Sequence, residues 1–342
     1  MPTQSIPLVS VTRGSLVECV HRGHIAVVDD AGRLLRSAGN PHHATYARSS
    51  AKLLQAVPVV ASGAAARFGL DLPELALLCA SHSGEARHVE AVARILEKLG
   101  LGEDALQCGA HPPYHKPSAD ALRRAGEAPR ASHNNCSGKH AGMLTLAKHL
   151  GATLHDYKLP EHPVQQAMLA SYAAFAGVAA ASVTLGVDGC GVPVYGAPLS
   201  ALALAYARLA APYGDAPEGD ARRTVVEAVQ AHPEMLAGEG RYDTGLIRAT
   251  NGRVVGKMGA EGVFAVAVPG EGLGLAVKIE DGSQRALYPA VTEALLQLGW
   301  IDADAGRALA EFHIPPIRNW SGDVVGAVLP SFRLVDATAP AP

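Results

Sequence analysis

The sequence predicts an α+β fold in which one antiparallel sheet is built from both chain ends, is flanked by helices and has a helical lobe inserted into it. Three observations predict this class: β-rich segments lie near the N-terminus, a mostly helical stretch fills the middle, and alternating strands return before a closing helix. The chain has 342 residues, of which 48% are hydrophobic and 18% are charged. This composition supports a large buried core and excludes a disordered or collagen-like chain.

The first strands are predicted within Ser15–Ala38, where apolar and β-branched residues flank the turn sequence Asp29–Gly32. Ser49–Phe68 then has a helical pattern that is interrupted by Pro58. The next predicted elements are an apolar element at Leu72–Ser81, an amphipathic helix at Arg87–Leu99 that ends at Gly100, a loop at Gly109–Pro117, and a cap at Asn134–Ser137 leading into a helix at Gly138–Leu150.

The segment His162–Val187 contains no Asp, Glu, Lys or Arg and is long enough to cross a bilayer. It is mainly Ala with interspersed Gln, Ser and Thr, so we interpret it as a buried helix followed by a strand. The remaining predicted elements are a tight turn at Asp188–Pro193, helices at Leu199–Leu209 and Ala221–Ala231 with a polar loop at Pro212–Gly219 between them, strands at Val254–Met258, Gly262–Val268 and Leu273–Glu280, and a helix at Leu287–Leu298.

This order predicts a sheet lobe made of residues 1–47 and 179–336, a mainly helical lobe at 48–178 and a flexible tail at 337–342. Lys and Arg total 29 against 32 Asp and Glu, a net charge of −3, so neither nucleic-acid binding nor an acidic tail is indicated. The five cysteines are scattered and odd in number, which excludes a disulfide framework and indicates a reducing compartment. Met1–Ser10 lacks the pattern of a signal peptide, so we expect a cytoplasmic protein without a membrane segment.

A serine and a lysine lie one helical turn apart in Arg48–Lys52. Ser49 and Lys52 are three residues apart, so they share a helix face, whereas Ser50 and Lys52 do not. A lysine with a lowered pKa can take the proton of a serine hydroxyl and make it nucleophilic. A surface serine and lysine near a helix start would give the same spacing, so this chemistry needs a second Ser/Lys element elsewhere.

Ser81 in Ala80–Glu85 and Lys257 in Val255–Gly262 are candidates for that second element. An exposed turn would present several hydroxyls of the first segment, and the glycines beside Lys257 would allow close backbone approach. Both features also have a purely structural explanation. The residues Ser81–Glu85 would form a helix N-cap, and Lys257 would be a solvated lysine on a strand.

Cys136 and Lys139 lie on the first turn of a predicted helix, and Cys190 follows in the predicted turn Asp188–Pro193. Two thiolates suit Zn²⁺, with His140, Asp188 or water as further ligands. Two buried thiols explain the same spacing. The segment around Lys139 does not match a phosphate-binding loop, because His133 stands where that motif has its first Gly and His140 stands where it has Ser or Thr. The glycines at 270–274 lie in a predicted hairpin turn and not between a strand and a helix, which excludes a dinucleotide-binding motif.

Taken together, these segments resemble the rhizobial-type L-asparaginase family, which has a serine-β-lactamase-like fold. The resemblance covers Ser15 to about Leu298 and is carried by five motifs in the family's order, Tyr46–Lys52, Ala80–Glu85, His133–Met143, Asp188–Pro193 and Gly256–Gly262. It implies hydrolysis of L-asparagine to L-aspartate and ammonia by an amidohydrolase that is typically a homodimer.

The resemblance also implies roles for individual residues. Two Ser–Lys tandems, Ser49/Lys52 and Ser81/Lys257, would be catalytic, with one serine forming an acyl-enzyme. A zinc site beside the pocket would use Cys136, Lys139 and Cys190. We further expect Arg48 to pair with the substrate carboxylate, and His82, Ser83 and Glu85 to orient its α-amino end, while Asp188 and His140 surround the metal.

Alternative functions are a glutaminase or a β-lactam hydrolase of the same architecture, because one methylene is worth only ~1–3 kcal/mol of discrimination in a pocket. A non-catalytic, zinc-stabilised binding protein of the same fold is the alternative from another class. The presence of both serines and both lysines argues against it, since binding alone would not need them.

Overall fold

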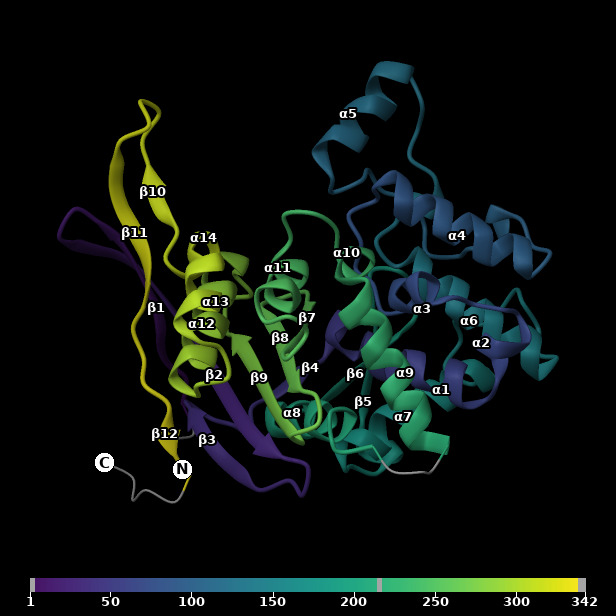
Figure 1. Cartoon of the computed structure of the whole chain (residues 1–342), viewed down its shortest axis with the longest axis horizontal. Coiled ribbons are helices and arrows are strands. Elements are labelled where there is room, and N and C mark those ends of the chain that lie inside the picture. Colours follow the sequence, from purple (N-terminus) through teal and green to yellow (C-terminus); the bar gives the residue numbers. More distant parts are fainter. Residues whose placement is uncertain (1–3, 214–216, 338–342) are drawn as a thin grey trace.

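The computed structural model describes residues 4–213 and 217–337 of the chain. Its main sheet has the strand order β10-β11-β1-β2-β9-β8-β7, with β3 beside β2 and β12 beside β3, and all of these pairs are antiparallel (Figure 1). The strand bounds are β1 (Ile6–Arg13), β2 (Leu16–Asp29), β3 (Leu34–Ala38), β7 (Val255–Gly259), β8 (Val263–Val268), β9 (Leu273–Ile279), β10 (Pro316–Arg318), β11 (Val324–Pro330) and β12 (Val335–Asp336).

The sheet carries a hydrophobic core on each face. In β2, Ala26 and Val28 belong to the core that includes the helical region, whereas Ile25 and Val27 belong to the core around α12 (Gln284–Gln297). This alternation follows from the period of two in a strand and explains why every residue of β2 from His24 to Asp29 is buried. The α+β class, with one sheet from both chain ends and helices on its faces, is therefore confirmed.

On the first of these faces, α8 (Leu199–Leu209) packs directly on β2 and β9. The close approach depends on Gly274, because a Cβ at this position would lie only 2.0 Å from the carbonyl oxygen of Ala203. A small second sheet in the order β4-β6-β5 borders this region. Its strands are β4 (Ala44–Tyr46), β5 (Thr184–Val187) and β6 (Pro193–Pro198).

The remaining helices form the right and upper parts of Figure 1 and the layer over α12. Their bounds are η1 (Arg48–Ala51), α1 (Lys52–Ala61), α2 (Ala64–Arg67), α3 (Leu72–Leu78), α4 (Ala86–Lys98), η2 (Glu103–Ala105), α5 (Lys116–Ala125), η3 (Ala131–His133), α6 (Ser137–Leu150), α7 (Pro163–Ala176), η4 (Ala180–Ser182), α9 (Pro217–Ala231), α10 (Pro233–Leu236), α11 (Tyr242–Ala249), α13 (Ala303–Ala308) and α14 (Ala310–His313). Helix α9 packs against α1 and α3, although its sequence lies in the segment predicted for the sheet lobe. The division into two lobes itself stays a prediction.

The uncharged segment is a helix followed by a strand, α7 and β5, as predicted. No helix in the described part of the chain combines the length and apolar character that a membrane crossing requires. The predictions omitted β1 and the C-terminal strands β10, β11 and β12, which extend the sheet at its edges. Of the predicted loop at 212–219 and tail at 337–342, residues 214–216 and 338–342 lie outside the described residues, and α9 already begins at Pro217.

Candidate active site

Ser49 lies in η1, a single 3₁₀ turn that leads into α1. The residue before it, Arg48, has φ 50°, a left-handed conformation that is uncommon for a residue other than glycine and is often found at functional sites. Gly259 of β7 lets the strand lie against this turn, since a Cβ there would be 2.7 Å from the carbonyl oxygen of Ala47. The backbone around Ser49 is thus fixed by the edge of the main sheet.

Lys52, the first residue of α1, is buried with its amino group in a network of three acceptors. Its Nζ lies 3.1 Å from Ser81 Oγ and 3.2 Å from Cys136 Sγ, and it also donates to the carbonyl oxygen of Ala80. In the described part of the chain, no hydrogen bond joins Lys52 to Ser49. The structure therefore brings Lys52 together with the second predicted serine and with a predicted zinc ligand.

Lys257 of β7 is fully buried, and its Nζ lies 2.8 Å from the carbonyl oxygen of Met258 and 3.4 Å from Asp243 Oδ1. Burial lowers the pKa of Lys257 to about 8; the nearby charge of Lys52 adds to the decrease and Asp243 opposes it. Repulsion from Lys52 thus contributes to the lowered pKa of Lys257, but burial is the larger cause. Among the described residues, no hydrogen bond joins Lys257 to Ser81.

The predicted zinc ligands are gathered around the start of α6. Cys136 is the N-cap residue of the helix, which has no side-chain cap hydrogen bond, and its own backbone N–H donates to Asn134 Oδ1 at 2.8 Å in the turn before the helix. Lys139 Nζ lies 3.1 Å from Cys190 Sγ. A hydrogen bond from Cys190 holds the pKa of the Cys136 thiol well below its usual value, and this outweighs the effect of burial.

Lys139 is buried beside these sulfur atoms. Burial lowers the pKa of Lys139, but the neighbouring charges of Cys190, Cys136 and Asp188 outweigh burial and raise it overall. Within the described residues, no three His, Cys, Asp or Glu side chains are placed to hold a metal ion together. A metal at this position would therefore need the amine of Lys139 as a ligand beside the two thiolates, which is the ligand set predicted from the sequence.

Arg48 and Asp188 form an ion pair beside this cluster. Arg48 Nε and Nη2 lie 3.1 Å and 3.0 Å from Asp188 Oδ1, and Nη1 lies 3.7 Å from Glu261 Oε1. Burial raises the pKa of Asp188, but the charges of Lys139 and Arg48 hold it below its ordinary value. The guanidinium of Arg48, predicted to bind the substrate carboxylate, is already engaged by carboxylates of this chain.

His82, Ser83 and Glu85 follow Ser81 and make internal contacts. His82 Nε2 lies 2.8 Å from Ser137 Oγ, and Ser83 Oγ donates to the carbonyl oxygen of Ala237 at 2.7 Å. Glu85 is the N-cap of α4, as the alternative interpretation of this segment expected, and it accepts the backbone N–H of Glu239 at 2.9 Å. These contacts fix the turn after Ser81; the predicted substrate-orienting roles stay predictions.

His140, predicted to lie near the metal, is buried within α6. Its Nδ1 is 2.7 Å from the hydroxyl of Tyr157, and its Nε2 is buried with no hydrogen-bond partner among the described residues. Burial, together with the charge of Lys139, lowers the pKa of His140 well below its usual value, so the ring is neutral near pH 7.

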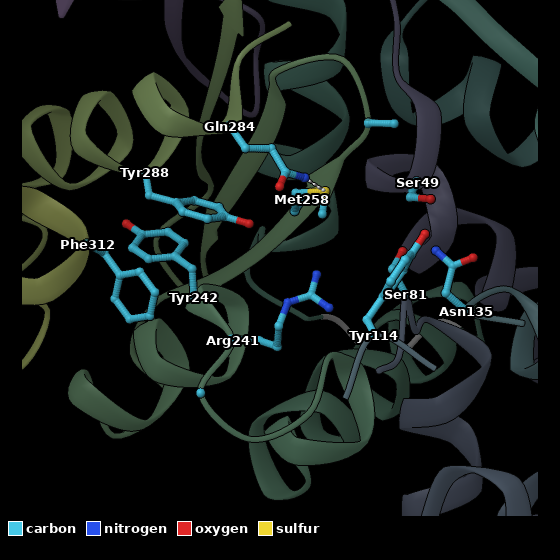
Figure 2. A pocket seen from close by; sticks show the side chains of 12 residues that line it. Ser49, Ser81, Tyr114, Asn135, Arg241, Tyr242, Met258, Gln284, Tyr288 and Phe312 are labelled. Atoms are coloured by element: carbon cyan, nitrogen blue, oxygen red, sulfur yellow. Dashed lines mark hydrogen bonds between the residues drawn. The ribbon is translucent and has the colours of Figure 1, made fainter. Parts of the chain in front are cut away.

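A pocket of about 560 Å³ opens above the two predicted nucleophiles (Figure 2). Ser49 and Ser81 lie on one side, an aromatic group of Tyr242, Tyr288 and Phe312 lies on the other, and Arg241 points into the space between them. The lining residues are Ser49, Ser81, Tyr114, Asn135, Gly240, Arg241, Tyr242, Met258, Ala260, Gln284, Tyr288 and Phe312. Of the predicted site residues, only the two serines are in this lining.

The family of the chain follows from a comparison with known families. A family model described as L-asparaginase II matches residues 9–330, nearly the whole chain. The chain belongs to this family. The predicted relation to L-asparaginases is thereby confirmed, and the L-asparaginase II family is one of amidohydrolases acting on a small-molecule substrate.

A search of curated proteins finds no match to this member of the L-asparaginase II family. Among solved structures, the protein titled Mglu is 15% identical and aligns over 82% of this chain and 67% of that chain, with a TM-score of 0.37. A β-lactamase, Mb2281c from Mycobacterium bovis, is 14% identical and aligns over 82% of this chain and 95% of that chain, with a TM-score of 0.33. The topology described above, a sheet from both chain ends with the helical region between them, is the arrangement predicted from the sequence.

The sequence predictions missed the part of the pocket that faces the serines. Arg241, Tyr242 and Tyr288 were not predicted as site residues, although Gly238 and Gly240 mark a loop just before α11. Gly238 has φ 119°, and a Cβ there would lie 2.6 Å from Ser83 Oγ, so this loop packs tightly over the turn that carries Ser81. Two glycines that closely precede an arginine ahead of a helix were the signal available in the sequence.

Proposed function

We propose that the protein hydrolyses L-asparagine to L-aspartate and ammonia through a Ser–Lys activated nucleophile and an acyl-enzyme. One observation carries the proposal: Ser49 and Ser81 line the same pocket, directly above a buried lysine that is hydrogen-bonded to Ser81. Binding alone would not require two buried lysines, whose desolvation is costly, beside two serines that line the pocket.

In the proposed reaction, Ser49 attacks the side-chain carboxamide of the substrate and its proton passes to the network of Lys52 and Ser81. Backbone N–H groups at the start of the helix meet the oxyanion. Ammonia leaves with a proton from the same network, and water then hydrolyses the acyl-enzyme. The lowered pKa of Lys257, about 8, supports its participation because part of this lysine is neutral near pH 7.

Ser81 is the alternative nucleophile, and the hydrogen bond from Lys52 to its hydroxyl is the observation in its favour. The two assignments differ in which side chain carries the aspartyl group. Mass spectrometry of an acid-quenched reaction identifies it, because the modified peptide contains either Ser49 or Ser81.

We propose a zinc ion held by Cys136, Lys139 and Cys190, with water completing its coordination. Support comes from the two buried thiols and the amine 3.1 Å from one of them. The ion would support the structure at the start of α6 and help to position the substrate, while Asp188 and His140 would surround it. Zinc binding would require Lys139 to lose its proton.

A homodimer and a cytoplasmic location are further proposals. They rest on the resemblance of the motifs to the rhizobial-type enzymes and on the absence of a disulfide among the five described cysteines. Sedimentation of the purified protein measures its oligomeric state.

Hydrolysis of glutamine is the second candidate, and the pocket volume of about 560 Å³ favours it because one more methylene would fit. Ammonia release from L-asparagine, L-glutamine and a chromogenic β-lactam, with and without a zinc chelator, separates the candidates. We expect the highest kcat/KM with L-asparagine. A protein that turns over none of these amides would be a binding protein of the same fold, and the proposal would be wrong.

A further inference from the structure

Arg241 is the only charged side chain among the described residues that line the pocket. Its guanidinium points into the cavity between the serines and the aromatic group (Figure 2). Nη1 lies 3.4 Å from Ser83 Oγ, and the guanidinium lies 6.0 Å from the ring centre of Tyr114. No Asp or Glu in the described part of the chain forms an ion pair with it. Arg241 therefore presents an uncompensated positive charge and free N–H donors to the pocket.

The other cations near the pocket are already engaged. Arg48 pairs with Asp188 and does not line the cavity, while Lys52 and Lys257 are buried and donate to acceptors of the protein itself. Arg241 is thus the cation placed to bind an anionic group of a ligand.

No Asp or Glu is found among the pocket-lining residues of the described chain. The nearby acids have cationic partners: Glu85 pairs with Arg87, Glu239 with Arg248, and Asp243 with Lys257. The pocket consequently offers a strong partner to a carboxylate and no free carboxylate to an ammonium group.

We propose that Arg241 binds the α-carboxylate of the substrate, and that the site recognises this negative charge without requiring the α-ammonium group. The inference rests on the proposed amidohydrolase function and specifies its substrate class, a carboxamide that carries a carboxylate. A guanidinium suits this role because its planar N–H donors can bind both oxygens of one carboxylate.

The size of the pocket supports the second part of this proposal. Asparagine has nine heavy atoms, which occupy at most about 270 Å³ if each takes the ~30 Å³ of a water molecule. The pocket is about twice as large, at about 560 Å³. The remaining space, bordered by the aromatic group, accommodates an acyl substituent on the α-nitrogen.

The test compares three amides with the wild-type protein and the Arg241→Gln variant. L-Asparagine has both α-groups, β-alaninamide lacks the carboxylate, and N-acetyl-L-asparagine lacks the ammonium. We expect wild-type kcat/KM to fall more on loss of the carboxylate than on acetylation. Arg241→Gln should lower kcat/KM about 10- to 100-fold for the two carboxylates and leave β-alaninamide within about twofold. Arg285→Gln, an exposed arginine outside the pocket lining, is the matched control with the same charge change.

An Arg241→Gln variant that loses activity equally toward β-alaninamide, or that loses none toward L-asparagine, overturns the role of Arg241. Faster hydrolysis of β-alaninamide than of N-acetyl-L-asparagine by the wild type overturns the stated recognition.

Calorimetry separates this inference from the proposed function, because binding needs no turnover. Wild-type protein should bind L-aspartate at least about tenfold more tightly than β-alanine, and Arg241→Gln should remove the difference. If that result occurs without amide hydrolysis, the proposed function fails and Arg241 still binds the carboxylate. Equal affinity of the wild type for the two acids overturns the inference itself.

Discussion

The amino nitrogen of Lys52 lies 3.1 Å from the hydroxyl oxygen of Ser81, a residue 29 positions further along the chain. The sequence spacing pairs Lys52 with Ser49 instead. Ser49 is nevertheless close in the fold, because it lines the same pocket as Ser81. Lys52 of the first predicted tandem therefore contacts the serine of the second, and its pairing with Ser49 stays a prediction.

Removal of Lys52 is expected to affect both serines. Lys52→Met should reduce kcat for L-asparagine by at least about 10³-fold, because the amine proposed to accept the proton of the nucleophilic serine is removed. Steady-state ammonia release measures this loss, and circular dichroism checks folding. Lys116→Met, which removes an exposed lysine, is the control. A variant with near-native kcat would contradict the assignment of Lys52.

Substitution of the two serines is expected to affect acyl-enzyme formation differently. Ser49→Ala should abolish the acyl-enzyme, whereas Ser81→Ala should slow its formation while the aspartyl group still forms on Ser49. Rapid quenching followed by intact-mass measurement detects the adduct in each variant. Ser182→Ala, at an exposed position, should behave as wild type. An adduct that persists in Ser49→Ala and disappears in Ser81→Ala would reverse the assignment.

The pH dependence should report Lys257. Burial lowers the pKa of Lys257 to about 8, so its neutral form increases as the pH rises through this value. If the neutral amine takes part in proton transfer, kcat/KM should increase from pH 6.5 to pH 8.5 and level off above it. Lys257→Met should lower kcat/KM and should abolish its increase between pH 6.5 and pH 8.5. A wild-type profile that stays flat across this range would argue against a titrating Lys257.

The zinc proposal predicts metal content. Purified wild-type protein should contain one zinc per chain by elemental analysis, and Cys136→Ser and Cys190→Ser should each lower the content severalfold. Cys79→Ser, which replaces a buried thiol that contacts the carbonyl oxygen of Leu75, should retain the zinc. Wild-type protein without zinc, or equal content in all variants, would exclude the site.

The glycine of β7 that faces the nucleophile turn should resist substitution. A Cβ at Gly259 would lie 2.7 Å from the carbonyl oxygen of Ala47, so Gly259→Ala should lower the free energy of unfolding by about 1–3 kcal/mol and displace Ser49. Urea unfolding measures the first effect and kcat the second. Gly245→Ala, in α11 with its nearest contact at 3.6 Å, is the matched control and should be neutral or stabilising. Equal stability of the two variants would show that β7 can shift away from the turn.

Local patterns in the sequence predicted most of the elements. The hairpin strands β7, β8 and β9 and the helices α6 and α8 were found because their signals lie within a few neighbouring residues. Strand β1 was missed although it contains the buried apolar residues Leu8, Val9 and Val11, of which Leu8 and Val9 are adjacent and interrupt a simple alternation. Its partner β11 lies more than three hundred residues away, and short strands at the sheet edge give no recognisable pattern of their own.

The candidate site shows the same limit. The motifs placed Ser49, Ser81 and the cysteines near one pocket, but i, i+3 spacing describes one helix and does not reveal a contact between α1 and the turn at Ser81. Arg241 was missed because its direction depends on the packing of its loop over Ser83, which no periodic pattern encodes.

Strand β1 pairs with β11, and Val9 lies opposite Pro330. This second partner of β1 is therefore synthesised more than three hundred residues after β1. During synthesis, the hairpin of β1 and β2 and the helices can form earlier. One edge of β1 has no partner until β11 (Val324–Pro330) emerges, on the order of 10 s or more after β1 itself. An unpaired strand edge attracts other chains. We therefore expect shortened forms that end before β11 to aggregate, even though they contain every residue of the candidate active site.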